Sequence, residues 1–164
     1  MMGGVGAGAG AAAAGVQRVG VVGAGTMGAG IAQVSAQAGF ETIGREVSEE
    51  LCERARGTIE HYLGRAVEKE KLTAEDRNAA LGRLTLTTSL QDLAGCDLVI
   101  EAIVEELEPK RDIFAELERN VGPDAILASN TSAIPIGKIA EATEHPERVV
   151  GMHFFNPAPV LQFV

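Results

Sequence analysis

The chain has 164 residues, a length typical of a single domain that is large enough to bury a hydrophobic core. Hydrophobic residues make up 46% of it, which excludes disorder over its whole length, and no apolar run reaches the roughly 18 residues of a membrane span. The net charge of −9 disfavours nucleic acids and anionic membranes as partners. We therefore expect a soluble protein, and its two widely separated cysteines, Cys52 and Cys96, predict reduced structural thiols in a cytoplasmic setting.

The N-terminal part begins with a low-complexity tract. Residues 1–17 are rich in glycine and alanine and lack the basic start of a signal peptide, so we expect a flexible leader. A short strand follows from Val19 to Val22, and after a glycine-rich turn a helix of small residues extends from Ala29 to Ala38 and ends at Gly39. Residues 40–44 predict the second strand.

The middle of the chain predicts two helices and two strands. Ser48 can cap a long helix with one apolar face, and Thr73 can cap a shorter helix whose first turn is acidic. Residues 84–88 alternate like an edge strand, whereas residues 98–104 are almost uniformly apolar, as a central parallel strand requires. The apolar positions expected on the buried face of the long helix are Leu51, Ala55, Ile59, Tyr62, Leu63, Ala66 and Val67.

The remaining elements continue this alternation. Pro109 suits the first turn of a helix, and residues 125–128 predict the fifth strand. A further helix is expected from Pro135 to near Thr143, and residues 148–154 predict a sixth strand that leads into a proline-rich turn. The inward stripe expected for the Pro109 helix is Ile113, Phe114, Leu117 and Val121. This order of elements predicts an α/β fold with a doubly wound, mostly parallel sheet.

A glycine-rich motif joins the first strand to the first helix. The pattern G-x-G-x-x-G starts at Gly23, in the context that a Rossmann-type dinucleotide-binding turn requires. An acidic residue about 20 positions further on, Glu46, can accept hydrogen bonds from both ribose hydroxyls, which favours NAD over NADP, although Arg45 could accommodate a 2′-phosphate. The alternative is a glycine-rich turn without a ligand. The predicted cofactor contacts of this part are Gly23, Gly25, Thr26, Met27, Gly28 and Glu46.

Polar residues follow two later strands. Ser132 comes after the fifth strand and His153 ends the sixth, so we expect both at the sheet edge where ligands of open α/β sheets bind. An imidazole can take up a hydroxyl proton near neutral pH, and a serine hydroxyl can donate to a developing oxyanion. Each residue also has a structural alternative, because a lone histidine can be a structural residue, and Thr131 or Ser132 could merely cap the next helix.

Four segments in the same order resemble the 3-hydroxyacyl-CoA dehydrogenase family, over residues 18–164. They are VGVVGAGTMGAGIAQ (residues 19–33), VIEAIVEELEPK (99–110), ASNTSAIPI (128–136) and HFFNPAPV (153–160), and they point to the bacterial 3-hydroxybutyryl-CoA branch. The resemblance implies an oxidoreductase that oxidises an L-3-hydroxyacyl-CoA to a 3-oxoacyl-CoA with NAD, in fatty-acid metabolism (β-oxidation) or butanoate metabolism. The alternatives are a dehydrogenase of another 3-hydroxy acid and a non-catalytic NAD-binding module.

The resemblance also implies roles for individual residues. His153 matches the catalytic histidine, Ser132 the serine that contacts the substrate, and Asn156 a residue that shapes the site. Lys69 matches a lysine that meets the phosphates of coenzyme A. No metal site is expected. The remaining implied cofactor contacts are Glu105, Lys110 and Asn130, of which Glu105 and Lys110 could instead form a solvated pair near a helix start.

The sequence departs from the family's pattern in a few places. The glutamate that orients the family's histidine would fall at position 165, one residue beyond Val164, followed by a helical domain that supplies most dimer contacts. We therefore expect the 164-residue chain to bind NAD with negligible turnover by itself, and the full-length enzyme to be a homodimer. Gly44 and Arg45 stand where the family usually has an apolar pair, and Gln162 stands where many members have lysine.

Overall fold

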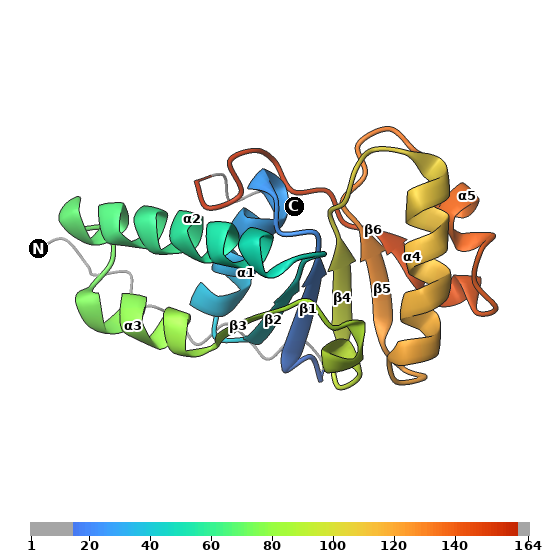
Figure 1. Ribbon diagram of the computed structural model, residues 1–164, viewed down its shortest axis with the longest axis horizontal. Helices are drawn as coiled ribbons and strands as arrows, with labels where there is room; N and C mark the ends of the chain where they lie inside the picture. The colour runs from blue at the N-terminus through green and yellow to red at the C-terminus, as the bar shows by residue number, and fades with distance from the viewer. Residues whose placement is uncertain (1–14, 161–164) are drawn as a thin grey trace, which may run out of the picture.

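A computed structural model describes residues 15–160 of the chain (Figure 1). Most of the predicted leader lies outside the described residues. Its last two residues belong to the folded domain, because Val16 packs against the hydrophobic core and the Gln17 N–H donates to the Asp97 carboxylate at 2.8 Å. The folded domain therefore includes at least the two residues before Arg18.

The strands form one six-stranded, parallel sheet in the order β3-β2-β1-β4-β5-β6 (Figure 1). This order confirms the predicted doubly wound α/β fold. The strands are β1 (Arg18–Val22), β2 (Glu41–Arg45), β3 (Leu84–Thr87), β4 (Leu98–Glu101), β5 (Ile126–Ser129) and β6 (Val149–Gly151). The helices are α1 (Thr26–Gln37), α2 (Glu49–Glu68), α3 (Ala74–Gly82), α4 (Leu107–Asn120) and α5 (Ile136–Ala140), with short 3-10 turns η1 (Leu90–Leu93) and η2 (Pro146–Arg148).

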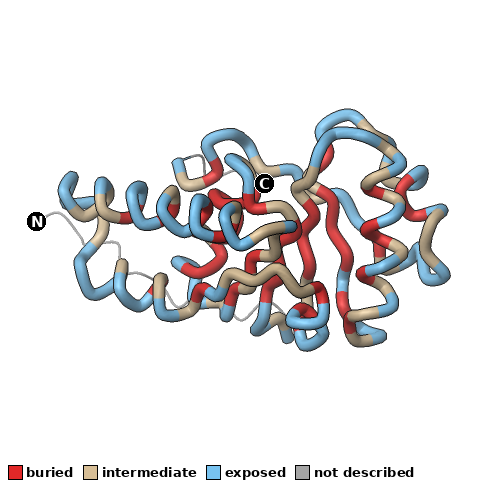
Figure 2. Tube along the Cα trace, viewed as in Figure 1, coloured by how far each residue is buried: buried red, intermediate tan, exposed pale blue. Residues whose placement is uncertain are grey.

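Helices cover both faces of the sheet, and the strands are the most deeply buried part of the domain (Figures 1 and 2). Successive side chains of a strand point to opposite faces. Val21 and Ile100 therefore pack in the core beneath α1, α2 and α3, whereas Val22 and Val99 pack in the core beneath α4 and α5. Because both faces are covered, the central strands carry continuous apolar residues, as predicted.

The predicted helix ends are confirmed at three positions. The Ser48 side chain accepts a hydrogen bond from the Leu51 N–H at 3.3 Å, and the Thr73 side chain accepts one from the Asp76 N–H at 3.0 Å, so both residues cap the helices that follow. Gly39 follows α1 with φ +102°, a conformation that favours glycine. The inward stripe of α4 is confirmed as well, since its four predicted residues are buried.

Several predicted boundaries differ from the structure. Helix α1 begins at Thr26 rather than Ala29, because the glycine turn already has helical conformation in its second half. Strand β4 ends at Glu101 rather than at residue 104, because the Glu101 carboxylate accepts the Ile103 N–H at 2.7 Å and turns the chain off the sheet. Val104 is consequently 60% exposed.

The C-terminal elements are shorter than predicted. Helix α5 ends at Ala140, whose carbonyl oxygen accepts a hydrogen bond from the Thr143 hydroxyl at 2.8 Å. Strand β6 has three residues instead of seven, because it lies at the sheet edge and pairs with β5 alone. In α2, Tyr62 is 55% exposed, since the face that packs on the domain is formed by Cys52, Ala55, Ile59 and Leu63. No helix among the described residues is long and apolar enough to cross a membrane.

Candidate functional site

The glycine-rich turn lies at the carboxyl end of β1, where the strand order reverses between β1 and β4. Ligands of open α/β sheets bind at this point. The Gly23 N–H donates to the Arg45 carbonyl at 3.0 Å, and the Ala102 N–H donates to the Val22 carbonyl at 2.8 Å, so the turn is held between the ends of β2 and β4. Gly23 has φ +87°, and a Cβ there would lie 2.8 Å from the Ala102 oxygen. The start of the turn therefore requires glycine.

The other two glycines of the motif have opposite surroundings. A Cβ at Gly28 would overlap the carbonyl oxygen of Gly23, so close packing of α1 on the turn requires this glycine. A Cβ at Gly25 would meet nothing within 4 Å. Gly25 is the N-cap of α1, without a side-chain cap and without an acidic residue in the first turn. The positive end of α1 thus faces open space, which fits a pyrophosphate.

Glu46 lies one residue beyond β2 and turns back toward the glycines. Its carboxylate accepts the Ala24 N–H at 2.5 Å and the Val47 N–H at 3.1 Å. The neighbouring Arg45 donates through Nε to the Thr88 carbonyl at 3.3 Å, toward β3. A carboxylate rather than a guanidinium therefore stands beside the turn, which fits the two ribose hydroxyls of NAD better than a 2′-phosphate.

Two cavities flank the first turn of α1. The first has a volume of about 410 Å³ and lies between α1, α2 and the segment 156–160, which crosses above α1 (Figure 1). Gly25, Thr26 and Glu46 line it. The second has a volume of about 450 Å³ and is lined by Met27, Ala102, Ile103, Glu105, Lys110, Asn130, Ser132, His153, Phe154, Phe155 and Asn156. Asn156 lines both cavities, so they adjoin at this residue.

Three charged residues, Glu101, Lys110 and Glu105, lie together beside the second cavity. We call them the charge cluster. The Lys110 ammonium lies 2.6 Å from Glu101 Oε1 and 3.3 Å from Glu105 Oε2. The side chains of Glu101 and Lys110 are 0% and 1% exposed. The solvated pair considered for Glu105 and Lys110 is therefore wrong, because Lys110 is buried and Glu101 is its nearer partner.

The segment 130–133 is held to the charge cluster by its backbone. Glu105 Oε1 accepts the Ser132 N–H at 3.1 Å, the Ala133 N–H at 3.3 Å and the Thr131 hydroxyl. Burial of Glu105 raises the pKa of its carboxyl, but the Thr131 hydrogen bond and the Lys110 charge lower it by more, so the net shift is downward. Glu105 thus remains ionised.

Thr131 and Ser132 divide the two roles that were considered for them. Thr131 Oγ1 accepts the Ile134 N–H at 3.0 Å, so it stabilises the turn before α5. Ser132 is exposed and lines the second cavity. The neighbouring Asn130 accepts the Phe154 N–H at 2.8 Å and so ties this turn to the chain after β6. The same bond brings Ser132 and His153 to one cavity.

His153 is exposed at the mouth of the second cavity. Its ring packs edge-on against Phe155, with ring centroids 5.1 Å apart and an interplanar angle of 72°. The two phenylalanines that follow His153 differ, since Phe154 packs against the core beneath α1. Phe155 is 48% exposed and supports the His153 ring instead.

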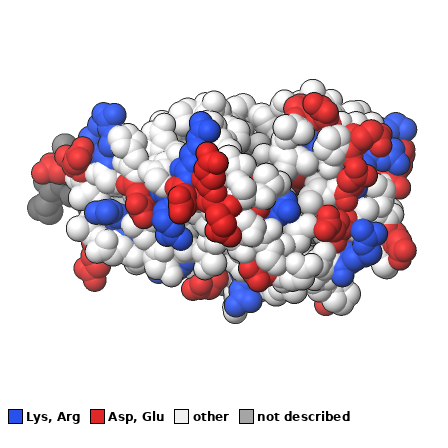
Figure 3. Space-filling view, in the orientation of Figure 1, with Lys and Arg blue, Asp and Glu red and all other residues white. Residues whose placement is uncertain are grey.

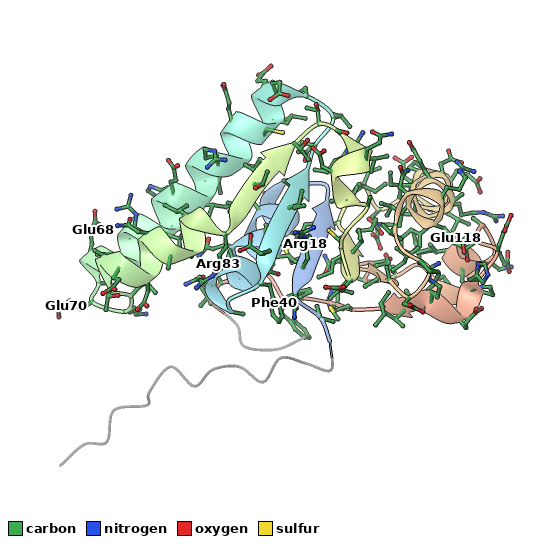
Figure 4. All side chains as sticks on the ribbon, turned by 90° about the horizontal axis from the view of Figure 1, so that it is seen from below. Arg18, Phe40, Glu68, Glu70, Arg83 and Glu118 are labelled. Carbon is green, nitrogen blue, oxygen red and sulfur yellow. The ribbon has the colours of Figure 1, made fainter. Side chains whose placement is uncertain are left out.

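The structure brings the predicted site residues together with three exceptions. Gly23 and Gly28 shape the turn from beneath and line neither cavity. Lys69 lies on the exposed end of α2 and also lines neither cavity; Glu68 and Glu70, which flank it, mark the far tip of this helix (Figure 4). The other two histidines, His61 and His145, are exposed, and both cysteines are buried and free.

Sequence reasoning missed two buried members of the site, Glu101 and Ser129. Glu101 interrupts an apolar run, and a lone charge within such a run was the available signal. Parallel pairing places Glu101 directly opposite Ser129, whose hydroxyl donates to Glu101 Oε2 at 2.6 Å. The sequence alone did not provide this partner.

The parallel strand order, the glycine turn and the adjacent carboxylate define a dinucleotide-binding domain of the Rossmann type. Residues 18–164 match the family described as 3-hydroxyacyl-CoA dehydrogenase, NAD binding domain. The chain belongs to this family and contains its NAD-binding domain.

Individual relatives support this assignment. A 3-hydroxybutyryl-CoA dehydrogenase of Mycobacterium tuberculosis is 57% identical over 150 residues, which are 91% of this chain and 52% of the relative. The crystal structure of FadB2 from the same species is similar with a TM-score of 0.87 and 58% identity, over 89% of this chain and 52% of that chain. A 3-hydroxybutyryl-CoA dehydrogenase structure from Escherichia coli K12 gives a TM-score of 0.88 and 47% identity, over 90% of this chain and 31% of that chain. The chain thus spans about half the length of the first of these curated relatives.

Proposed function

We propose that this chain is the NAD-binding part of an enzyme that oxidises an L-3-hydroxyacyl-CoA, with 3-hydroxybutyryl-CoA as the proposed substrate, to the 3-oxoacyl-CoA. One observation carries the proposal: Ser132, His153 and Asn156 line a single cavity that begins beside the first turn of α1. A substrate hydroxyl in this cavity would lie near both a base and a hydroxyl donor. The printed names of the relatives support the same substrate class.

NAD would lie across the N-terminus of α1, in contact with both cavities. The backbone N–H groups at Gly25, Thr26 and Met27 would receive the pyrophosphate, and Glu46 would accept the hydroxyls of the adenosine ribose. The second cavity would take the nicotinamide end, beside Glu105, Lys110 and Asn130. When bound, NAD accepts the hydride that leaves the substrate carbon.

His153 is the proposed general base. A ring nitrogen would take the hydroxyl proton, and the Ser132 hydroxyl would donate a hydrogen bond to the same oxygen as negative charge develops on it. Phe155 restricts rotation of the imidazole by its edge contact. Asn156, which lines both cavities, would shape the wall between cofactor and substrate.

The remaining parts of the proposal rest on fewer observations. Lys69 lies exposed at the end of α2, where an ammonium could meet the phosphates of coenzyme A. A homodimer is proposed from the family resemblance. A reducing compartment such as the cytoplasm is proposed because both cysteines are free and buried.

Binding of the cofactor is tested on the 164-residue chain by titration with NADH, followed by nicotinamide fluorescence. Saturable binding is expected, with negligible reduction of acetoacetyl-CoA by the chain alone. Among residues 15–160, no carboxylate accepts a hydrogen bond from the His153 ring, so the base lacks an orienting partner there. A folded sample without a saturable NADH signal would contradict the proposal.

The chemistry is tested with a chimera in which residues 18–164 replace the matching half of the M. tuberculosis relative. The chimera is expected to reduce acetoacetyl-CoA with NADH and to leave free acetoacetate unchanged. The variant H153Q should lower kcat by about 100- to 10,000-fold, the usual contribution of a general base. Equal rates with acetoacetate would instead favour a dehydrogenase of free 3-hydroxy acids.

A further inference from the structure

Glu101 is a fully buried carboxylate to which the proposed reaction gives no role. It ends β4, the strand that pairs with β1 directly before the glycine turn. Its Oε1 accepts the Lys110 ammonium at 2.6 Å and the Ile103 N–H at 2.7 Å, and its Oε2 accepts the Ser129 hydroxyl at 2.6 Å. Every oxygen of this buried carboxylate therefore has a donor.

Stability alone does not account for this arrangement. Removing a carboxylate and an ammonium from water carries a large desolvation cost, and apolar residues of similar volume often serve a fold equally well. Lys110, the partner of Glu101, lines the second cavity together with the base and the serine of the proposed reaction, whereas Glu101 lies buried behind it. This placement suits an ion pair that fixes the positions of the residues around it.

Two chains of contacts run from Glu101 to the segment 130–133. The first passes through Lys110 to Glu105, which accepts the Ser132 N–H. The second passes through the Ser129 hydroxyl, which accepts the Thr131 N–H at 3.2 Å. The two oxygens of one carboxylate thus fix both ends of the turn that presents Ser132 to the cavity.

The Lys110 ammonium has little freedom in this arrangement. It can donate three hydrogen bonds, and it lies within reach of Glu101, Glu105 and the Ile103 carbonyl at 3.5 Å. Without the Glu101 charge, the ammonium would be drawn to Glu105 alone, and Glu105 would be drawn away from the Ser132 and Ala133 N–H groups. The orientation of Glu105 toward the cavity therefore depends on Glu101.

We infer that Glu101 is a positioning residue for the nicotinamide half of NAD: through Lys110 and Ser129 it holds Glu105 and the 130–133 turn in place around the second cavity. The inference rests on the proposed function, since it assumes that the nicotinamide end occupies this cavity. Glu101 itself does not touch the ligand, because it is completely buried. Its removal should weaken contacts to one half of the cofactor and leave the other half unaffected.

The test compares two ligands on the 164-residue chain by titration calorimetry. NADH carries both halves, whereas ADP carries the adenosine and diphosphate and lacks the second ribose and the nicotinamide. The variant E101Q keeps the shape of the side chain and removes its charge. We expect its affinity for NADH to fall about tenfold, as for the loss of a hydrogen bond to a charged group, and its affinity for ADP to stay within about twofold of wild type.

Two further variants complete the design. S129A leaves all charges in place and removes only the second chain of contacts, so it should lower the affinity for NADH about threefold. If E101Q does not fold, the result for S129A decides the question. E118Q is the matched control, because Glu118 also lies on α4 and accepts the backbone N–H groups of Glu144 and His145, far from the site. It should leave the ratio of NADH to ADP affinity unchanged.

The outcomes are distinct. An unchanged ratio in folded E101Q, or in S129A where E101Q is unfolded, would overturn the inference, as would an equal loss of affinity for both ligands. A wild-type chain that binds ADP and not NADH would overturn the placement of the nicotinamide end, and one that binds neither ligand would overturn the proposed function itself. A selective loss of NADH affinity supports the positioning role.

Discussion

The glycine turn and the charge cluster lie at the ends of adjacent strands and are the proposed contacts of opposite ends of NAD, yet they are built in different ways. The turn depends on backbone direction and on the lack of a Cβ atom at its glycines, since its last glycine packs against a carbonyl oxygen and its middle glycine faces open space. The charge cluster depends on three side chains that compensate one another. The turn should therefore fail when an atom is added, and the cluster when a charge is removed.

Removal of the Lys110 charge should have the largest effect on stability. In K110M, the buried Glu101 carboxylate loses its counter-ion and faces Glu105 without compensation. Breaking one partner of a buried ion pair typically costs about 3–5 kcal/mol of the free energy of unfolding. Urea unfolding followed by circular dichroism measures this loss.

An exposed ion pair provides the control. Lys138 lies 2.9 Å from Glu141, with both side chains at least half exposed, so K138M should change the free energy of unfolding by less than about 1 kcal/mol. If K110M cost no more than K138M, the cluster would contribute as little as a surface pair. The contrast with the turn would then disappear.

Addition of one methyl group should break the turn. In G28A, the new Cβ overlaps the Gly23 carbonyl oxygen, and overpacking of this kind costs about 1–3 kcal/mol. Gly57 lies on the exposed surface of α2, where an added Cβ would meet no atom within 4 Å, so G57A should instead add about 0.5–1 kcal/mol. Thermal unfolding of both variants measures these opposite signs.

The middle glycine separates folding from binding within the same turn. In G25A, the added methyl meets no protein atom and should cost less than about 1 kcal/mol of the free energy of unfolding. It projects into the space proposed for the pyrophosphate, so NADH affinity should fall at least about tenfold. Wild-type NADH affinity in G25A would show that the pyrophosphate lies elsewhere.

The two regions also differ in how well the sequence predicts them. The position of the turn and its need for glycine at both ends were predicted, because its six residues are contiguous and their requirements come from backbone geometry next to a strand and a helix, although its second half is already helical. Ser132 and His153 were placed correctly at the sheet edge, since parallel strands end on the same side. Both predictions use short-range patterns and one general rule of topology.

The charge cluster was predicted only in part. Glu105 and Lys110 came from the family resemblance, whereas Glu101 was passed over inside an apolar run. Its partners become visible only when β4 pairs with β5 and α4 folds back over the sheet, which are contacts between distant residues. The boundary of β4 was misjudged for the same reason, because the bond from Ile103 to Glu101 ends the strand.

The charges themselves are unevenly distributed over the surface. On the face shown in Figure 3, acidic and basic side chains gather over α2 and over the α4–α5 end, and the upper surface between them carries few charges. The cofactor's negative charge would therefore meet the positive end of α1 rather than a surface of lysines. The net charge of −9 is compatible with an anionic ligand for this reason.

A third carboxylate, Glu118, tests whether hydrogen bonds from loop N–H groups to a carboxylate matter away from the site. Glu118 on α4 (Figure 4) accepts the Glu144 N–H at 2.7 Å and the His145 N–H at 2.8 Å. Burial raises the pKa of its carboxyl, but these N–H groups and the His145 ring lower it by more. Because the folded pKa lies below the unfolded one, the stabilisation is complete above the ordinary glutamate pKa and is lost as pH falls through the lowered value.

The smallest predicted effect follows from this sign. E118Q should lose about 1 kcal/mol of the free energy of unfolding at pH 7, and its difference from wild type should shrink as the pH is lowered through the acid range, because the wild-type carboxyl then becomes neutral as well. Urea unfolding at a series of pH values measures this difference in the free energy of unfolding. The matched control is E141Q, which changes an exposed glutamate in the same way. A difference that stays constant with pH would assign the effect of E118Q to packing rather than to charge. Glu118 would then resemble the glycine turn, where shape decides, more than the charge cluster.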